Sequence, residues 1–376
     1  MIVVLHVVGR MDRGGAESRI MDLYRNVDRS RIRFDFVQHT TDRCAFADEV
    51  EELGGRIYSI PRFRFSNWTA YRKAWSDLFQ EHPEIRIVHG HMTSTAGIYL
   101  PIAKKHGVAF TIAHARSAGT DPGLKGMLTR LLRRNLWKKA DACFACSRLA
   151  SQAVFGKAVP YFPNAIEVDR FAFDPALRQT VRQELGLEKA FILGHVGRFN
   201  PVKNHPFLLE VLKKCMEFEP KTHLILLGEG SEEERIRRLA KEMRIEENVR
   251  FLGNQKEVYR YYQAMDYFLL PSFYEGLPGT AIEAQACGLP GLMSDRITEE
   301  AVVCETMEQL PIQQGPAPWA SRIKAVSEMS ETERSRKRVQ DAETGRRAVK
   351  EAGFDVKIQA QRIQEFYLEK GRQQEK

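Results

Sequence analysis

Residues 266–295 read DYFLLPSFYEGLPGTAIEAQACGLPGLMSD, and this stretch contains two apolar runs separated by a helical pattern. The runs DYFLLPS and LPGLMSD have the length and apolar content of buried strands, whereas residues 280–286 suit a helix. Two strands joined by a helix form a β-α-β unit, and such a unit requires a parallel sheet that is covered by helices. This stretch therefore predicts an α/β protein.

The same alternation extends toward both ends of the chain. Strands are expected at IVVLHVV, FDFVQHT, GRIYSI, IRIVHGH, AFTIAHA and DACFACS, with helical patterns between them. The stretch VPYFPNAIEVDRFAFDP is rich in Pro, Asn and Asp and interrupts the pattern, after which FILGHVGR and THLILLG begin a second series.

Two doubly wound, Rossmann-like domains follow from this division, at residues 1–165 and 166–350. Domains of this kind commonly hold a ligand in a cleft at the carboxyl ends of their strands. Helical patterns rich in charge follow residue 315, and we expect residues 351–376 to form a C-terminal helix that packs back toward the N-terminal domain.

The charge balance narrows the choice of partners. The 376 residues include 57 Lys and Arg and 49 Asp and Glu, which gives a net charge of +8. This excess fits an anionic small molecule or a phospholipid surface; without an RNP-like motif or a Cys/His finger, nucleic acid is not expected. No stretch reaches the ~18–20 uncharged apolar residues of a membrane-spanning helix. We therefore expect a cytoplasmic protein, soluble or peripheral on the inner face of the cell membrane.

Two glutamates bracket the helix start in EGLPGTAIE. Glu275 falls where the strand DYFLLPS has ended, and Glu283 lies about one turn into the helix. The free backbone N–H groups at a helix start favour an anion such as a diphosphate. Carboxylates accept hydrogen bonds from vicinal hydroxyls, so one glutamate could hold a sugar and the other a ribose. The alternative is that each is an ordinary turn or surface residue.

Two cations follow another strand in HVGRFNPVKNH. Arg198 and Lys203 lie in the loop after Gly197, and loops after strands in such a sheet face the ligand. Arg binds phosphate oxygens in a bidentate manner and Lys adds a point charge, so together they could stabilise a diphosphate leaving group without a metal. No D-x-D motif stands in a suitable context, and we expect no required divalent ion. A solvated loop with two cations is the alternative.

The glycines of LLGEGSEEE, at residues 226–234, do not make a dinucleotide site. The motif lacks a third glycine, and the three glutamates that open the next helix would repel a pyrophosphate. An NAD site is therefore not expected.

Taken together, these segments resemble the retaining glycosyltransferases of family 4, which have the GT-B fold, and in particular the bacterial exopolysaccharide members. The resemblance rests on an E-x7-E pair in EGLPGTAIE, a G-R-x4-K motif in GRFNPVK, a glycine-rich loop in MDRGGAE and a domain junction in FPNAIEVDRF. It covers the chain from its first residue to about residue 295, with the motifs in the family's order.

The resemblance implies roles for the residues of the second domain. Arg198 and Lys203, after Gly197, would hold the diphosphate. Glu275, with the backbone of Gly276 and Leu277, would hold hydroxyls of the donor sugar, and Glu283 would hold the ribose.

It also implies roles for the first domain. Gly14 and Gly15 would let the backbone approach the phosphates, which a side chain there would obstruct. A histidine of this domain would reach the transferred sugar; His114 in AFTIAHA matches best and His91 in HGHMTS is second. A buried scaffold histidine is the alternative for both.

A basic helix is expected at residues 124–139. The stretch GLKGMLTRLLRRNLWKK holds six basic residues and no acidic one, with leucines and a tryptophan among them. A basic amphipathic helix can rest on an anionic membrane. The alternative is a core helix whose cations are solvated.

The function that these features imply is a retaining transfer of a hexose or N-acetylhexosamine. The donor would be a nucleotide diphosphate sugar, UDP-linked, and the acceptor a saccharide or a lipid-linked saccharide in surface polysaccharide synthesis. A UDP-sugar 2-epimerase on the same fold and a scaffold without turnover are the alternatives. The sequence does not name the donor sugar, the acceptor or the linkage.

Overall fold

The computed structural model describes residues 1–12, 14–116 and 123–372, without the side chains of residues 123–125 and 128. The chain divides into two compact units. Unit 1 comprises Met1–Ala165 and Asp355–Lys376, and unit 2 comprises Ile166–Phe354. Among the described residues, no helix is long and apolar enough to cross a membrane.

Unit 1 is built on a six-stranded sheet in the order β3-β2-β1-β4-β5-β6, and every strand pair is parallel. The order reverses direction between β1 and β4, which makes their carboxyl ends a topological switch point, where open α/β sheets bind ligands. The strands are β1 (Ile2–Val7), β2 (Ile32–Gln38), β3 (Ile57–Ser59), β4 (Ile85–Gly90), β5 (Phe110–Ala115) and β6 (Ala142–Ala145).

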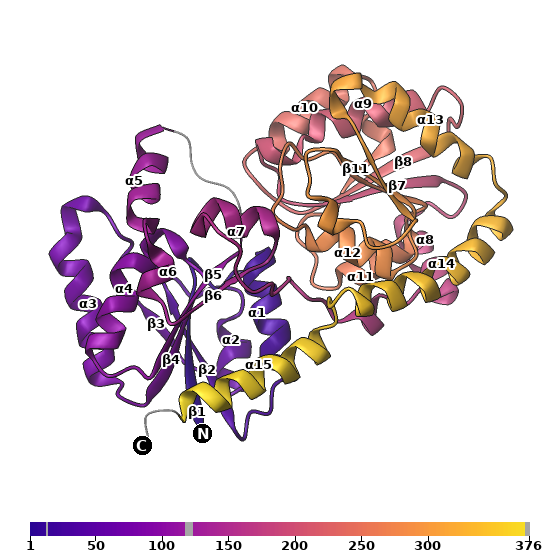
Figure 1. Ribbon diagram of the computed structural model, residues 1–376. Helices are drawn as coiled ribbons and strands as arrows, with labels where there is room; N and C mark the ends of the chain where they lie inside the picture. The colour runs from indigo at the N-terminus through magenta and orange to yellow at the C-terminus, as the bar shows by residue number, and fades with distance from the viewer. Residues whose placement is uncertain (13, 117–122, 373–376) are drawn as a thin grey trace. The chain divides into compact units, whose positions relative to one another are not determined.

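Helices cover both faces of this sheet, as Figure 1 shows. They are α1 (Gly15–Asn26), α2 (Ala47–Glu52), α3 (Trp68–Glu81), α4 (Thr93–Lys105), α5 (Gly123–Arg133), α6 (Leu136–Lys139), α7 (Arg148–Phe155) and α15 (Val356–Gly371).

The last helix, α15, belongs to unit 1 although the whole of unit 2 precedes it in the sequence. It packs against α1, β1 and β4 (Figure 1) and places Val356, Ile363 and Tyr367 in the core of unit 1. Gln359 Nε2 donates to the carbonyl oxygen of Pro163 at 2.8 Å, which ties the helix to the end of the N-terminal segment.

Unit 2 repeats the architecture with a parallel sheet in the order β12-β11-β10-β7-β8-β9. Its switch point lies between β7 and β10, where the strand order reverses. The strands are β7 (Phe191–Val196), β8 (Thr222–Leu227), β9 (Val249–Phe251), β10 (Tyr267–Leu270), β11 (Gly291–Ser294) and β12 (Met307–Leu310). The helices are α8 (Pro175–Leu185), α9 (His205–Cys215), α10 (Glu233–Glu242), α11 (Val258–Ala264), α12 (Gly279–Ala286), α13 (Pro316–Ser327) and α14 (Glu331–Glu351).

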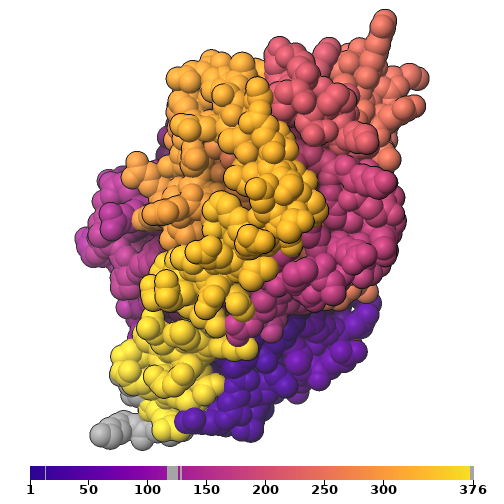
Figure 2. Space-filling view, turned by 90° about the vertical axis from the view of Figure 1, so that its right-hand side faces the viewer, coloured from indigo at the N-terminus to yellow at the C-terminus, as the bar shows by residue number. Residues whose placement is uncertain are grey.

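Helix α14 is rich in charge, and it is held by close backbone contacts and one buried arginine. A Cβ added at Gly288 would lie 2.2 Å from Ala342 N, and one at Gly345 would lie 2.1 Å from Gln285 O, so neither position has room for a side chain. Arg338 donates to the carbonyl oxygens of Met265, Cys287 and Tyr262. On the outside of unit 2, α14 runs beside α8 (Figure 2), and Glu331 pairs there with Arg178.

The prediction of one continuous helix over residues 124–139 is wrong, because the structure has two helices there. Helix α5 ends at Arg133, and Asn135 adopts a left-handed backbone with φ of 56°, after which the short α6 begins. Asn tolerates this conformation better than most residues. The basic segment is therefore two helices with a bend between them.

Candidate active site

The two motif-bearing loops of unit 2 meet at its switch point. Residues 197–204 follow β7 and residues 271–278 follow β10, and these strands are neighbours in the sheet. Phe273 N donates to the carbonyl oxygen of Val202 at 2.9 Å. Lys203 Nζ lies 2.6 Å from Glu275 Oε1, and these side chains are 16% and 18% exposed. The structure thus brings together a cation and a carboxylate that are far apart in the sequence.

The loop after β7 has a shape that depends on Gly197. A Cβ at this position would lie 2.8 Å from His195 Nε2 and 3.0 Å from Lys203 Cε. The aliphatic part of Lys203 therefore passes close over Gly197, and a larger residue there would have to displace His195 or Lys203. Asn200 Oδ1 accepts a hydrogen bond from Lys203 N at 3.2 Å, which fixes the backbone of the same turn.

The loop after β8 packs directly against the Arg198 loop. A Cβ at Gly228 would lie 2.2 Å from Gly197 O, and one at Gly230 would lie 2.3 Å from Phe199 O. Phe199 N also donates to Glu229 O at 3.0 Å. Close packing between the two loops thus explains Gly228 and Gly230 of LLGEG, and a dinucleotide site is not required to explain them.

Arg198 differs from Lys203 in its surroundings. It is exposed, and its guanidinium forms no ion pair or hydrogen bond with the residues that the structure describes. The charge of Lys203 is offset by Glu275, whereas the charge of Arg198 is available to an anion at this edge.

Glu283 lies on α12, which begins after Pro278, and its side chain is buried. Glu283 Oε2 accepts a hydrogen bond from the Tyr262 hydroxyl at 2.9 Å. It is therefore not an exposed helix residue. Gly276 is half-buried and Leu277 is buried, in the turn between Glu275 and α12.

The glycines expected at the phosphates of unit 1 lie at the start of α1. Gly14 is its N-cap residue, with φ of −96°, and Gly15 is its first residue. Neither has a positive φ, so backbone conformation does not demand glycine here. A Cβ at Gly15 would meet no protein atom within 4 Å.

Four histidines lie beside the switch point of unit 1. His6 is on β1, His89 is on β4 with His91 just after it, and His114 is on β5. His6 Nδ1 is 2.9 Å from His91 Nε2, and His89 Nε2 is 3.0 Å from His114 Nδ1. The Tyr367 hydroxyl of α15 reaches His89 Nδ1 at 2.5 Å.

Arg116, the residue directly after β5, joins this network through His91. Arg116 Nε donates to His91 Nδ1 at 3.2 Å, and Nη1 donates to Asn164 Oδ1 at 2.5 Å. Guanidinium groups only donate, so His91 Nδ1 must be the acceptor and its proton must sit on Nε2. His91 Nε2 then donates to His6 Nδ1. This chain of donors fixes the tautomer of both histidines.

The histidines of this network are uncharged at neutral pH. Burial, and then the charge of Arg116, lowers the pKa of His6 to about 3. Burial also lowers the pKa values of His89, His91 and His114, with further contributions from Arg116 and from the neighbouring rings. His114 has no exposed surface, whereas His91 is partly exposed. Of the two histidines considered for contact with a sugar, His91 lies nearer the surface.

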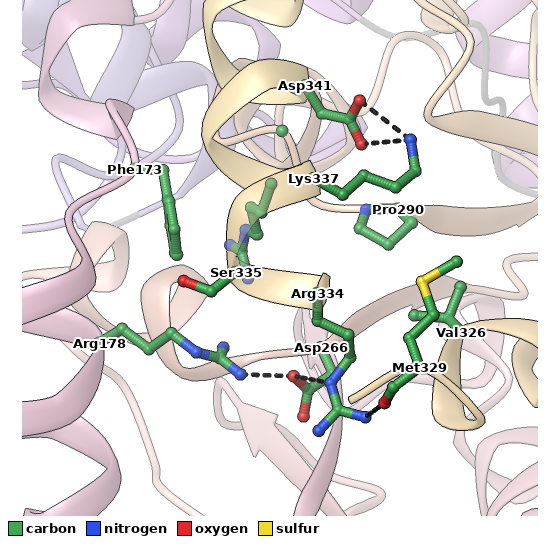
Figure 3. Close-up of a pocket in the computed structure, with 12 residues that line it drawn as sticks. Phe173, Arg178, Asp266, Pro290, Val326, Met329, Arg334, Ser335, Lys337 and Asp341 are labelled. Carbon is green, nitrogen blue, oxygen red and sulfur yellow. Dashed lines mark hydrogen bonds and ion pairs between the residues drawn. The ribbon is translucent and has the colours of Figure 1, made fainter. Parts of the chain in front are cut away.

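A different pocket of unit 2 lies at the opposite end of β10. Asp266 precedes this strand and Glu275 follows it, so the two mark opposite edges of the sheet. Figure 3 shows Asp266 bound by Arg178 and Arg334 under α14. The cavity measures about 40 Å³, which holds a few water molecules but no nucleotide. Burial would raise the pKa of Asp266, but Arg178 and Arg182 hold it at about 2.

Comparison with solved structures places the fold in a known class. Anabaena HepE in complex with UDP superposes with a TM-score of 0.78 at 18% identity, covering 97% of this chain and 99% of HepE. The paired Rossmann-like units are those of a GT-B glycosyltransferase, as expected from the sequence. Family models for a glycosyl transferase 4-like domain and for glycosyl transferases group 1 match residues 14–164 and 178–344. The chain belongs to glycosyltransferase family 4 and is a glycosyltransferase.

Curated relatives agree with this assignment. The glycosyltransferase EpsF of Bacillus subtilis is 33% identical, covering 85% of this chain and 86% of EpsF. The capsular polysaccharide biosynthesis glycosyltransferase CapH of Staphylococcus aureus is 26% identical over 98% of this chain and 99% of CapH. A third is UDP-Gal:alpha-D-GlcNAc-diphosphoundecaprenol alpha-1,3-galactosyltransferase of Escherichia coli, 29% identical over 35% of this chain and 36% of the relative.

Sequence reasoning missed several polar residues that these sites contain. His6, His89, Arg116 and Asn164 were not singled out in unit 1, and neither was Tyr262 in unit 2. The available signal was the repetition of polar residues at strand ends, in HGH at residues 89–91 and HAR at residues 114–116.

Proposed function

We propose that this enzyme transfers a hexose or N-acetylhexosamine, with retention at the anomeric carbon, from a UDP-sugar to a saccharide or lipid-linked acceptor in surface polysaccharide synthesis. The observation that carries the proposal is the Lys203–Glu275 pair at the switch point of unit 2, with Arg198, which pairs with no described residue, in the same loop as Lys203. Two cations and one carboxylate at one sheet edge match a diphosphate joined to a hydroxyl-rich ring.

The chemistry follows from these charges. The bond between the anomeric carbon and the diphosphate oxygen breaks, and its electron pair moves onto the diphosphate. Arg198 and Lys203 stabilise the negative charge that develops there. The acceptor hydroxyl oxygen forms the new bond to the anomeric carbon and gives its proton to the departing phosphate oxygen. Glu275, held by Lys203, accepts hydrogen bonds from hydroxyls of the donor sugar.

Glu283 is assigned to the ribose of the donor. Its carboxylate is buried and hydrogen-bonded to Tyr262, so its position is fixed before the ligand arrives. A fixed acceptor loses little conformational freedom on binding.

The relatives support the donor and acceptor classes. HepE is described in complex with UDP, and CapH by its role in capsular polysaccharide biosynthesis. The Escherichia coli relative acts on a diphosphoundecaprenol-linked sugar. These names favour a UDP-linked donor and a saccharide carried on a lipid diphosphate.

No divalent metal enters this proposal, because Arg198 and Lys203 supply the positive charge. One group of ring nitrogens in unit 1, from His6, His89 and His91, lies within 4.8 Å and could geometrically surround an ion. The adjacent guanidinium of Arg116 opposes a second cation there.

A donor panel tests the proposal. The full chain is incubated with UDP-glucose, UDP-galactose and their N-acetylamino counterparts, and UDP release and the sugar product are measured. Free UDP with a free or transferred sugar supports a glycosyltransferase. A donor epimerised at C2 would support the epimerase alternative, and an unchanged donor in every case would support a scaffold.

The basic segment of unit 1 carries the proposed contact with the inner face of the cell membrane. Met127, Leu131 and Trp137 are 54%, 61% and 39% exposed. Exposed cations, Arg130, Arg134 and Lys138, lie among them. Apolar side chains exposed beside cations, without an acidic residue, suit an anionic lipid surface. In favour of the core-helix alternative, Leu136 is buried and Leu132 is half-buried.

Vesicle co-sedimentation separates these views. Wild-type protein should bind vesicles that contain phosphatidylglycerol at low salt and leave them at high salt. Replacing Arg130, Arg134 and Lys138 with Glu should abolish binding and leave UDP release from the donor unchanged. The matched control replaces three exposed lysines of unit 2 with Glu, an equal change of charge, and should still bind; these are Lys189, Lys213 and Lys241. A wild type that ignores the vesicles would show that the segment is structural.

A further inference from the structure

Arg116 is a half-buried cation that has only neutral hydrogen-bond partners among the described residues. These partners are the imidazole of His91 and the side-chain amide of Asn164. The remaining nitrogen, Nη2, is buried and has no hydrogen-bond partner among the described residues. A buried charge without a counter-ion, and with an unused donor, is costly.

Two other buried arginines, Arg178 and Arg182, meet this cost with a carboxylate, and a third, Arg338, directs all three of its nitrogens to backbone carbonyl oxygens. Arg178 and Arg182 bind the carboxylate of Asp266 at 2.5 and 3.1 Å. Arg33 binds the buried carboxylate of Asp35 at 2.9 Å. In contrast, no hydrogen bond or ion pair joins Arg116 to a carboxylate within the described part of the chain.

Arg116 nevertheless keeps its charge at neutral pH. Burial lowers the pKa of its guanidinium to about 10, and Cys146, Tyr367 and Glu17 oppose this decrease while Arg19 adds to it. The site therefore holds a full positive charge together with a buried Nη2 that no described residue of unit 1 accepts a hydrogen bond from.

The neighbouring histidines hold this guanidinium in place. Because His91 Nδ1 and Asn164 Oδ1 only accept from it, they orient the group without neutralising it. Behind His91, His6 accepts the next hydrogen bond and is itself uncharged. The hydrogen bonds of this network therefore hold the Arg116 guanidinium in one position.

The location of Arg116 is the place where a ligand is expected. It follows β5 directly, at the carboxyl edge of the sheet. His6 and His91 connect it to the carboxyl ends of β1 and β4, which flank the switch point of unit 1.

We propose that Arg116 binds a phosphate group of a substrate through Nη2, which is buried and has no hydrogen-bond partner among the described residues. The proposal rests on the proposed function, in which two substrates carry a diphosphate: the UDP-sugar donor and a lipid-diphosphate-linked acceptor. A planar guanidinium with spare N–H groups matches phosphate oxygens in geometry and charge. The anion would supply the partner that the described residues do not provide.

Binding measurements on the full chain test this proposal. UDP and a short-chain prenyl-diphosphate-linked N-acetylglucosamine are titrated into the wild type and into Arg116→Met and Arg116→Lys. Loss of one charged hydrogen-bonding group should weaken binding of one probe by about 10–100-fold in Arg116→Met. Arg116→Lys should retain part of the affinity, because it keeps the charge and loses the fork.

Thermal unfolding of the unliganded variants distinguishes ligand binding from a structural role. Arg116→Met leaves no buried carboxylate without its cation, although His91 Nδ1 and Asn164 Oδ1 lose a donor, so the Tm should fall by less than in the matched control. The matched control, Arg33→Met, leaves Asp35 buried and unpaired; it should lower the Tm and keep wild-type affinity for both probes.

The binding and unfolding results show whether Arg116 binds the donor, the acceptor or neither. Weaker binding of UDP alone assigns Arg116 to the donor, and weaker binding of the lipid-linked probe alone assigns it to the acceptor. Unchanged affinity for both probes, or a lower Tm that accounts for the whole loss, overturns the proposal while the proposed function stands. A wild type that binds no UDP and releases none from any donor overturns the proposed function itself.

Discussion

Acidification should destabilise unit 1 through its buried histidines. In the unfolded chain His6 takes up a proton near its ordinary pKa of 6.5, whereas in the folded chain it does so only near pH 3. The unfolded state therefore binds more protons below pH 6.5, so stability is complete above that value and falls as the pH decreases. At pH 5 this difference amounts to about 2 kcal/mol for His6 alone.

The neighbouring histidines act in the same direction. His89, His91 and His114 also have lowered pKa values, and a charge on one of these rings would face Arg116 and the other rings. The loss for the whole network should therefore exceed the loss for His6, although the contributions are not additive, because the rings contact one another.

The assay is urea unfolding followed by tryptophan fluorescence. In a Trp319→Phe chain, the remaining tryptophans, at positions 68, 75 and 137, all belong to unit 1. Unfolding free energies are measured at pH 7.5 and pH 5.0. The matched variant is His6→Asn, because an Asn oxygen can accept from His91 but does not titrate.

His6→Asn should be less stable than its parent at pH 7.5, since it loses the packing of the ring against Phe34, at 4.2 Å between centroids. Between pH 7.5 and 5.0 it should lose about 2 kcal/mol less than its parent does. If both chains lose the same free energy, proton uptake by His6 does not explain the acid sensitivity of unit 1.

Three further predictions concern unit 2. Replacing Arg198 or Lys203 with Ala should remove on the order of 2–4 kcal/mol of transition-state stabilisation, measured as kcat/KM for UDP release, with unchanged Tm; wild-type turnover would contradict the assignment. Donor turnover should persist in excess EDTA, whereas complete loss that magnesium or manganese restores would show that a metal is required. Asp266→Asn should destabilise unit 2 by about 3–5 kcal/mol, because two buried arginines lose their shared carboxylate. The assay is Trp319 fluorescence in a chain in which Trp68, Trp75 and Trp137 of unit 1 are replaced with Phe. The pKa of Asp266 is held at about 2, so its contribution should be present above pH ~4 and lost as the pH falls toward 2; no change in the Asn variant would refute this.

The sequence predicted the fold because the decisive signals are local. Apolar runs of strand length, separated by helical patterns, imply parallel sheets, and the two strand orders confirm this prediction. The G-R-x4-K and E-x7-E segments each follow a strand, and the sheet rule that places such loops at one edge explains why Lys203 and Glu275 meet.

Burial was harder to predict because it depends on partners far away in the sequence. From its sequence alone, Glu283 on α12 could be an exposed helix residue. In the structure α14 packs on α12, and the Tyr262 hydroxyl of α11 donates a hydrogen bond to the Glu283 carboxylate. His89 lies in an apolar strand, and its partner Tyr367 is 278 residues away.

The bend at Asn135 shows that the end of a helix can be hard to predict from the sequence. The stretch from residue 124 to residue 139 contains no Pro and only one Gly, near its start, so nothing in its pattern stops a helix. The interruption depends on a single left-handed residue and on the buried Leu136 that follows it, which only tertiary packing determines.

The return of α15 to unit 1 has a consequence for synthesis on the ribosome. The first 165 residues leave the ribosome long before Val356, Ile363 and Tyr367, which complete their core. Unit 2 is continuous in sequence and can therefore close its core while the nascent N-terminal segment still exposes apolar surface. Synthesis of α15 thus determines when the segment that precedes unit 2 becomes fully folded, and this nascent segment is the part most in need of a chaperone.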